Sequence, residues 1–263
     1  MPELPDVEVF RRYVNSTSLK QKIRNVEVED KDILDNISSR SFQIKLKGET
    51  LKSATRHGKY LFISLNRDDK LLLHFGMTGK LKYYKNENDK PEYSKVIFDF
   101  TNGYHLSYIC PRKLGKISLI KDKEKFISEK KLGPDPLSDD FNWKDFKDLF
   151  EDRRGKIKSG LMNQKVIAGI GNVYSDEILF HAGVHPFTEI KKLSERELKK
   201  IYKQLKSVIK KAIDANADHE KFPKNFLVTK RKDGEKCPKC GGTIKQKKYS
   251  GRSAHFCKDH QNE

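Results

Sequence analysis

The first residues that could do chemistry are a proline and a glutamate directly behind the initiator methionine, in the opening MPELPDVEVF. Methionine ahead of a small residue is readily removed, and its removal leaves Pro2 with a free secondary amine beside the Glu3 carboxylate. Such an amine is a nucleophile with a useful neutral fraction near pH 7. The same letters also fit an ordinary helix start, with Pro and acids in the first turn ahead of Val7, Phe10 and Val14. Taken alone, the opening favours the helix start.

A second group has the residue types and spacing of a metal site: Cys237, Cys240, Cys257 and His260. Two pairs, each separated by two residues, are typical of zinc ribbons, because tetrahedral zinc takes four ligands from two rigid turns. His255 and Asp259 are alternatives to His260 as the fourth ligand. The surrounding forty residues are rich in Lys and Arg and poor in apolar residues, so we expect one structural Zn²⁺ to hold them. The alternative is a basic tail with free thiols.

A glycine pair occurs in AGIGNVY, directly before an apolar stretch that we expect to be helical. The spacing does not fit a dinucleotide-binding fingerprint, and no parallel-sheet pattern surrounds it. A loop that opens onto a helix can still bind an anion, and here backbone N–H groups and the Asn172 amide are available to a phosphate. A simple packing element of two helices and a turn fits the same letters.

The overall charge also points to a polyanionic partner. The 263 residues carry a net charge of +18, and their field attracts nucleic acid at ordinary salt concentrations, although a merely solvated lysine-rich surface gives the same number. No apolar run is long enough to span a bilayer, and the N-terminus lacks a signal-peptide core. We therefore expect an intracellular protein without membrane contact, in which four cysteines do not form disulfides.

Among the elements that must position these residues, the first half of the chain has the pattern of short strands. Alternating or apolar runs occupy residues 26–28, 42–46, 60–65, 71–75, 81–84, 96–100, 104–109 and 116–120. They follow a predicted N-terminal helix. Without long helical patterns between them, these runs predict an antiparallel sandwich or barrel-like domain.

The pattern becomes helical after the turn-rich stretch GPDPLSDDFN. Ser194 and Glu197 form a capping box ahead of a long amphipathic face that reaches Ile213. Shorter helices are predicted for 143–150 and 173–181. We expect an α+β protein with an N-terminal domain over 1–130, a helical domain over 131–222 and a zinc finger over 223–263.

Taken together, the motifs resemble the bacterial formamidopyrimidine-DNA glycosylase and endonuclease VIII family of base-excision repair enzymes. The resemblance covers essentially the whole chain and rests on the order of these blocks: MPELPDVE, RHGKYL, HFGMTG, PRKLG, LGPDPLSDDF, LMNQKVIAGIGNVYSDEILFHAGVHP and GRSAHFC. It implies a β-sandwich catalytic domain, a helix-two-turn-helix domain and a zinc-finger hairpin. MPELP is closer to the formamidopyrimidine branch, because the endonuclease VIII branch typically has Gly at the fourth position.

The resemblance implies a bifunctional DNA glycosylase and AP lyase that acts as a monomer, in the cytoplasm or nucleoid, on double-stranded DNA with damaged bases or abasic sites. In this family the N-terminal proline attacks the sugar carbon, and the cationic iminium then favours β- or β,δ-elimination. By this resemblance Pro2 is the nucleophile and Glu3 the proton donor and shuttle. The lesion must first be flipped out of the duplex.

The resemblance also assigns roles to residues that contact DNA. Positions that grip phosphates around the flipped nucleotide correspond to Lys59, His74, Asn172 and Arg252, and the resemblance places Lys59 and Arg252 with Pro2 and Glu3 among the catalytic residues. Positions that fill the vacated space in the helix correspond to Met77, Arg112 and Leu114. Without the resemblance, Met77 and Leu114 fit ordinary core positions. Glu177 matches an acid that orients rather than reacts.

Departures from the family pattern concern the lesion. Leu114 stands where 8-oxoguanine enzymes usually carry Phe, and Cys110 replaces an acid. The segment between Ile213 and Cys237 is shorter than in members that cap flipped 8-oxoguanine with a loop. We therefore expect weaker selectivity for 8-oxoguanine and more activity on formamidopyrimidines, hydantoins or oxidised pyrimidines. Alternatives are an endonuclease VIII-like enzyme for oxidised pyrimidines, a non-catalytic DNA-binding zinc protein and an RNA-binding ribbon protein.

Overall fold

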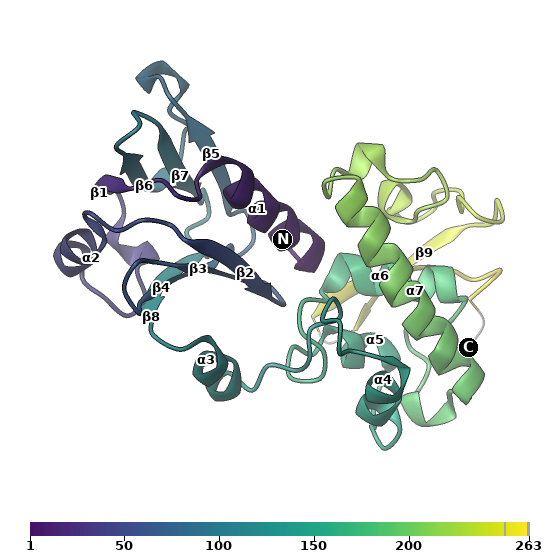
Figure 1. Cartoon of the computed structure of the whole chain (residues 1–263). Helices are drawn as coiled ribbons and strands as arrows, with labels where there is room; N and C mark the ends of the chain where they lie inside the picture. The colour runs from purple at the N-terminus through teal and green to yellow at the C-terminus, as the bar shows by residue number, and fades with distance from the viewer. Residues whose placement is uncertain (250, 262–263) are drawn as a thin grey trace. The chain divides into compact units, whose positions relative to one another are not determined.

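The chain divides into two compact units in the computed structural model, which describes residues 1–249 and 251–261. Unit 1 comprises residues 1–2 and 6–131, and unit 2 comprises residues 3–5 and the chain from Leu132 onward (Figure 1). The first turn of the N-terminal helix therefore belongs to unit 2, although the rest of that helix belongs to unit 1. The predicted division into three parts stays a prediction.

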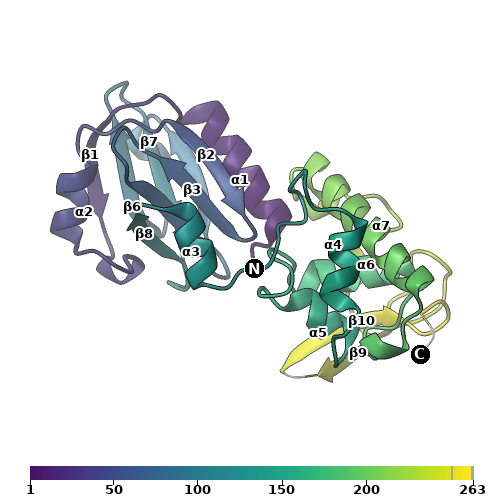
Figure 2. The ribbon, with the colours of Figure 1, turned by 60° about the horizontal axis from the view of Figure 1, so that its bottom comes forward.

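Unit 1 contains two four-stranded antiparallel sheets, as predicted. One sheet has the order β1 (Ile23–Val28), β6 (Ser94–Phe100), β7 (His105–Ile109) and β5 (Lys80–Tyr84). The other has the order β2 (Ser53–His57), β3 (Tyr60–Ser64), β4 (Lys70–His74) and β8 (Lys116–Ile120). The two sheets are visible as separate layers in Figure 2.

Apolar side chains from both sheets and from the N-terminal helix form one core. Helix α1 (Leu4–Thr17) was predicted, and it contributes Val7 and Val14 to this core. Leu73 of one sheet and Phe98 of the other belong to the same buried cluster. Burial of each such side chain contributes about 1.5–3 kcal/mol, so this core fixes the ends of the strands where site residues lie.

The predicted strand at 42–46 is wrong, because these residues belong to α2 (Ser39–Leu46). The Ser38 side chain caps the helix by accepting a hydrogen bond from the Ser41 N–H at 3.3 Å. Phe42 and Leu46 are buried, while Ile44 between them is 66% exposed. Apolar residues four apart share one helix face, so the letters FQIKL fit a helix as well as a strand.

Several elements escaped the sequence patterns because they are short. In unit 1 these are β2, α3 (Lys123–Glu129) and the 3₁₀ turns η1 (Lys31–Ile33) and η2 (Glu87–Asp89). In unit 2 they are α5 (Ile157–Met162), η3 (Ile190–Lys192), η4 (His219–Lys221) and η5 (Val228–Lys230). Each has few residues, so hydrophobic periodicity has little length over which to repeat.

Unit 2 is built around α6 (Asn172–Ala182), which contacts α5, α7 (Glu195–Asp214) and the hairpin strand β10 (Arg252–Cys257). Helix α4 (Trp143–Phe150) packs on α7, and β9 (Ile244–Tyr249) completes the hairpin. The three predicted helices are confirmed, including the reciprocal capping box at the start of α7. Eight of the 11 residues of α6 are buried, so these side chains are held rigidly.

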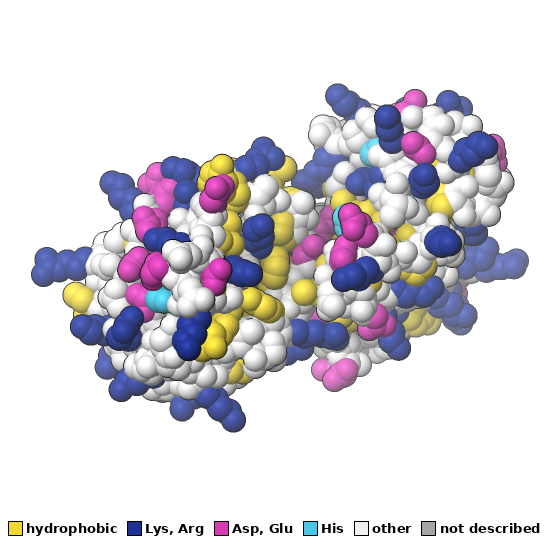
Figure 3. Space-filling model, turned by 90° about the horizontal axis from the view of Figure 1, so that it is seen from above, with side chains coloured by type: hydrophobic (Ala, Val, Ile, Leu, Met, Phe, Trp, Pro, Cys, Tyr) yellow, Lys and Arg dark blue, Asp and Glu magenta, His cyan; other side chains and the backbone are white. Residues whose placement is uncertain are grey.

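Charged side chains are scattered over the face of the molecule that Figure 3 shows. On the face shown in Figure 3, Lys and Arg project at many points, with acidic side chains between them. The net charge of +18 is therefore distributed over the surface rather than confined to one tail. Among the described residues, no helix has both the length and the apolar character that crossing a membrane requires.

Candidate functional site

The Glu3 carboxylate is buried against the N-terminus of α6. Its Oε2 accepts hydrogen bonds from the N–H groups of Gly171 at 2.6 Å and Tyr174 at 3.3 Å, and its Oε1 accepts one from Val173 at 2.8 Å. Only 1% of the residue is exposed. The first N–H groups of a helix have no partner inside the helix and favour an anion. Glu3 supplies that anion from the other end of the sequence.

Two glycines make this close approach possible. A Cβ atom on Gly171 would lie 2.5 Å from Glu3 Oε1, and one on Gly169 would lie 2.6 Å from the Leu4 Cβ. Gly169 also has φ +97°, which side chains rarely adopt. The Gln164 amide holds the loop, because it accepts from the Gly169 N–H at 2.9 Å and donates to the Ile170 carbonyl at 2.7 Å. The two glycines therefore allow Glu3 and Leu4 to pack directly against this loop.

This arrangement corrects the predicted use of the same loop as a backbone phosphate site. The N–H groups of Gly171, Val173 and Tyr174 are bonded to Glu3. These three groups are therefore not open to a phosphate, and the buried Oδ1 of Asn172 has no hydrogen-bond partner in the described part of the chain. The prediction that the helix start binds an anion is confirmed for the Glu3 carboxylate, and a phosphate contact of Asn172 stays a prediction.

Pro2 immediately precedes this buried acid. Met1 is 54% exposed, so the chain is accessible to solvent directly before Pro2. A single peptide bond separates the Pro2 ring from Glu3, whose carboxylate is fixed by three hydrogen bonds. Pro2 therefore lies between a solvent-accessible terminus and a rigidly held acid.

Lys59 and His74 lie close together in unit 1. Lys59 is in the turn between β2 and β3, and His74 ends β4, where its Cα pairs with that of Tyr60. The His74 and Tyr60 rings lie 4.9 Å apart. Burial, together with the positive charges of Lys59 and Lys130, lowers the pKa of His74 to about 4. His74 is therefore neutral at pH 7 and can donate one ring N–H without carrying charge.

We expect His74 to make the stability of the protein fall with acidification. Because its folded-state pKa lies below the ordinary value of 6.5, the unfolded chain binds more protons between about pH 6.5 and 4, and stability is lost as pH falls through that window. Between pH 7.5 and 5 the loss is of order 1–2 kcal/mol. Urea unfolding of His74→Gln should show a correspondingly weaker pH dependence. Equal slopes for both proteins would contradict this prediction.

Met77, Arg112 and Leu114 lie on two turns of unit 1 that touch each other. A Cβ atom on Gly76 would lie 2.6 Å from the Gly115 nitrogen, and the Arg112 N–H donates to Thr78 Oγ1 at 3.4 Å. Met77 is 39% exposed and Leu114 is 50% exposed, so their interpretation as ordinary core residues is wrong. Large apolar side chains on rigid, exposed turns are typical of an interaction site.

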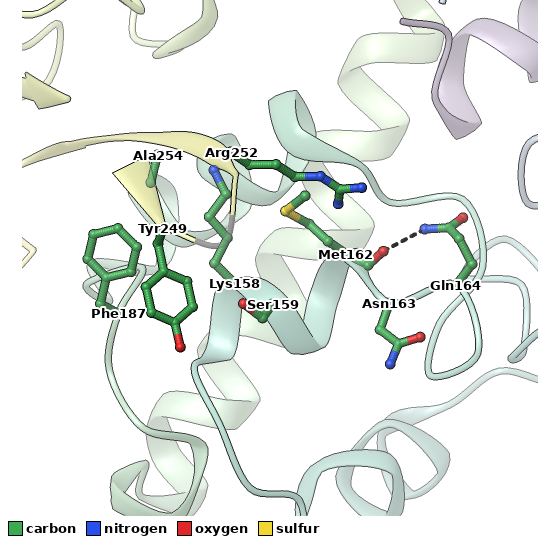
Figure 4. A pocket seen from close by; sticks show the side chains of 9 residues that line it. All are labelled: Lys158, Ser159, Met162, Asn163, Gln164, Phe187, Tyr249, Arg252 and Ala254. Carbon is green, nitrogen blue, oxygen red and sulfur yellow. Dashed lines mark hydrogen bonds between the residues drawn. The ribbon is translucent and has the colours of Figure 1, made fainter. Parts of the chain in front are cut away.

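Arg252 lies on the hairpin of unit 2, beside a pocket of about 430 Å³. It begins β10 opposite Tyr249 and is exposed. Figure 4 shows the rings of Tyr249 and Phe187 side by side, Lys158 next to them, and the Arg252 side chain extended past Met162. A guanidinium on a hairpin that also presents an aromatic ring suits a phosphate backbone.

Glu177 has no route to solvent. Its two carboxylate oxygens accept hydrogen bonds from the N–H groups of Leu227 and Val228, each at 2.8 Å. Glu177 therefore ties α6 to the segment that connects α7 with the hairpin. This geometry agrees with an orienting function, and it gives the carboxylate no contact with solvent.

The predicted zinc ligands come together at the end of the hairpin remote from Arg252. The ligand atoms of Cys237, Cys240, Cys257 and His260 all lie within 4.8 Å of one another. The Sγ atoms of Cys240 and Cys257 are 3.5 Å apart, close to the roughly 3.8 Å between sulfurs that a tetrahedral zinc at about 2.3 Å requires. Nε2 of His260 faces the Phe180 carbonyl at 3.3 Å, which leaves Nδ1 for the metal. The residues fit one structural Zn²⁺.

The alternative fourth ligands have other contacts. The His255 Nε2 lies 3.0 Å from the Gln246 side-chain oxygen, and Asp259 lies against Gly242. Two buried charged residues of unit 2 were missed altogether, namely Lys158 and Asp176. The sequence did contain a signal for Asp176. It stands beside Glu177 in YSDEILF, and an acid within a mostly apolar helical stretch indicates a buried charge.

Comparisons with known proteins agree with this arrangement along the whole chain. Residues 1–117 match the formamidopyrimidine-DNA glycosylase N-terminal domain, residues 132–223 match the corresponding H2TH domain, and residues 234–259 match the zinc finger found in FPG and IleRS. The formamidopyrimidine-DNA glycosylase of Bacillus subtilis is 33% identical over 271 residues, which cover 98% of each chain. That of Desulfitobacterium hafniense is 30% identical with the same coverage.

Solved structures give the same result. A point mutant of Lactococcus lactis FPG, in complex with DNA containing Fapy-dG, has a TM-score of 0.90 at 30% identity over the full length of both chains. The complex of Lactococcus lactis Fpg with abasic-site DNA has a TM-score of 0.89 at 29% identity, over 99% of this chain and 100% of that one. Fold and site together define a base-excision repair DNA glycosylase with AP lyase activity. The chain belongs to the formamidopyrimidine-DNA glycosylase family.

Proposed function

We propose that Pro2 is the nucleophile that releases damaged bases from double-stranded DNA and then opens the abasic site. Once Met1 is removed, the Pro2 nitrogen bonds to C1′ of the flipped nucleotide while the bond from C1′ to the base breaks. Glu3 takes up the proton that leaves the Pro2 nitrogen and donates it to the ring oxygen as the sugar opens, while the departing base takes a proton from solvent. A cationic iminium remains. That charge acidifies C2′, so loss of its proton expels the 3′ phosphate, and a second elimination can expel the 5′ phosphate.

The position of Glu3 is the observation that carries this proposal. A buried carboxylate fixed by three backbone N–H groups, next in sequence to Pro2, is a preorganised proton donor and acceptor rather than a surface charge. An acid with only a capping function would be adequately placed in solvent at the helix end.

Borohydride trapping tests the proposal directly. The protein is incubated with a duplex that contains formamidopyrimidine or an abasic site, reduced, and digested, and the modified peptide is identified by mass spectrometry. We expect the DNA fragment on the Pro2 nitrogen of chains that lack Met1, and no adduct on chains that retain it. An adduct on a lysine side chain, or equal trapping of both forms, contradicts the assignment.

We propose that the remaining residues of the motifs bend and hold the DNA. Lys59, His74 and Asn172 contact phosphates beside the flipped nucleotide, and Met77, Arg112 and Leu114 fill the space that it leaves. The exposure of Met77 and Leu114 on rigid turns supports this use. Glu177 orients the segment after α7. We place this activity in the cytoplasm or nucleoid, carried out by a monomer.

Arg252→Ala should weaken DNA binding by about 1.5–3 kcal/mol, because a charge-assisted contact to a phosphate is lost. This corresponds to a roughly 10- to 150-fold higher Kd. Fluorescence anisotropy with an abasic-site duplex at fixed salt measures it. Arg196→Ala, an exposed arginine in the first turn of α7, is the matched control and should change Kd little. A change within about 0.5 kcal/mol for Arg252→Ala contradicts the contact.

The lesion preference that we propose is broader than 8-oxoguanine. The segment from Asp214 to Lys236 is anchored by buried Phe222 and Phe226 and by the bonds to Glu177, which leaves little chain for a cap over a flipped base. Cys110 is also buried and faces the Gly115 N–H at 3.4 Å, not solvent. A single-turnover panel of 8-oxoguanine, formamidopyrimidine, hydantoin and thymine glycol duplexes tests this preference.

A further inference from the structure

Asp176 is a fully buried carboxylate that binds three separate parts of unit 2. Its Oδ1 accepts a hydrogen bond from Lys158 Nζ of α5 at 2.5 Å. Its Oδ2 accepts from the Arg231 guanidinium at 2.7 Å and from the His255 backbone N–H of β10 at 3.1 Å. Asp176 is 1% exposed and Lys158 is 4% exposed. One side chain of α6 thus joins α5, the segment after η5 and the hairpin.

Lys158 extends this network to the residue beside Arg252. Its ammonium donates a second hydrogen bond to the Ser253 carbonyl at 3.0 Å. Both Lys158 and Arg252 line the 430 Å³ pocket, where Figure 4 shows their side chains next to each other. Asp176 therefore holds β10 at two points, through the His255 N–H directly and through Lys158 at Ser253.

The zinc site cannot fix this end of the hairpin. Cys257 is the last residue of β10 and Arg252 is the first, so about 17 Å of strand separates the metal from the guanidinium. The outer half of the hairpin has few apolar contacts, chiefly Ala254 and the Tyr249 ring against Phe187. Without the Asp176 network, the tip could tilt on α5 while the metal end stayed in place.

Stability alone does not explain such a network. Burying the charges of Asp176 and Lys158 costs solvation free energy that their mutual attraction often fails to offset, and apolar side chains of similar size are frequently as stable. The buried carboxylate instead fixes the relative positions of its partners, because charge-assisted hydrogen bonds hold them in one geometry. Two cations on one carboxylate also leave positive charge beside the pocket.

We infer that Asp176 is a positioning residue for DNA binding, which sets the place of Arg252 on unit 2 through β10 and Lys158. The inference rests on the proposed contact between Arg252 and a phosphate. Asp176 itself touches neither DNA nor the reacting atoms. Its effect passes through Arg252, and this dependence can be measured.

A double-mutant cycle of Asp176→Asn and Arg252→Ala tests the inference, with Kd for an abasic-site duplex as the readout. Asp176→Asn alone should raise Kd about 5- to 30-fold, with little change in the single-turnover rate at saturating enzyme. In the Arg252→Ala background, the same substitution should change Kd less than about 2-fold. Zinc content and thermal unfolding show whether each variant is folded, and Asp214→Asn, an exposed acid at the end of α7, is the matched control.

The cycle separates failure of the inference from failure of the phosphate contact. If Arg252→Ala itself leaves Kd unchanged, the proposed phosphate contact fails and the inference fails with it. Two results overturn the inference alone. In the first, Arg252→Ala weakens binding but the fold-changes in Kd of the two substitutions simply multiply in the double variant. In the second, Asp176→Asn leaves Kd unchanged. Should Asp176→Asn not fold, the pair Asp176→Asn with Lys158→Met removes both buried charges while keeping the volume. In a cycle of this double variant with Arg252→Ala, the changes in binding free energy must then be non-additive.

Discussion

Glu3→Gln should slow base release by roughly 10²- to 10⁴-fold, the usual contribution of a positioned general acid or base. Glutamine has nearly the same shape, and its carbonyl oxygen can still accept from the N–H groups of Gly171 and Tyr174, whereas its NH₂ group cannot accept from Val173. It cannot give or take a proton in the reaction. The substitution therefore removes the chemical function of Glu3, keeps the contacts with Gly171 and Tyr174, and loses only the one with Val173.

Single-turnover excision of formamidopyrimidine from a duplex, with enzyme in excess, is the appropriate measurement, because product release does not affect it. Zinc content and Kd for DNA should stay near those of the unmodified protein. Glu27→Gln, at an exposed position on β1, is the matched control and should react normally. A rate within about threefold of the original for Glu3→Gln means that another group moves the proton.

The sequence predicted correctly those features whose residues lie close together along the chain. The zinc ligands are two pairs within short turns, and the α7 capping box spans four residues, so both could be located from the letters alone. The letters FQIKL could not decide between strand and helix. Their burial depends on packing of α2 against β1, which neighbouring residues do not encode.

Local sequence patterns could not predict that Glu3 is the partner of the glycine loop. Gly171 and Glu3 are separated by 168 positions, and only the fold brings them together. The sequence marks the loop as special through its glycines, and the anion preference of a helix start follows from physics. Which anion binds there depends on tertiary structure. The same limit applies to Asp176, whose partners come from three separate segments.

Removal of zinc should unfold the finger and weaken DNA binding at least as much as Arg252→Ala, that is, by about 10-fold or more. The finger's apolar contacts form two small clusters, one around Ile244 and one around Phe256. Such clusters do not offset the entropy of ordering the hairpin, whereas a structural zinc contributes roughly 10–16 kcal/mol of apparent binding free energy in small finger peptides. The sandwich of unit 1 has its own core and should stay folded.

Hydrogen exchange with and without a chelator, together with metal analysis and Kd, checks this expectation. Protection of β9 and β10 should be lost while that of β3 and β4 persists. Cys240→Ser should reproduce the effect by removing one ligand. Cys110→Ser offers the matched control, because Cys110 is buried in unit 1 and is not one of the clustered metal ligands, so its change should leave zinc content intact. A chelated protein that keeps both its hairpin protection and its Kd would show that the four ligands do not hold the finger. The placement of Arg252 would then depend on the Asp176 network and apolar packing alone.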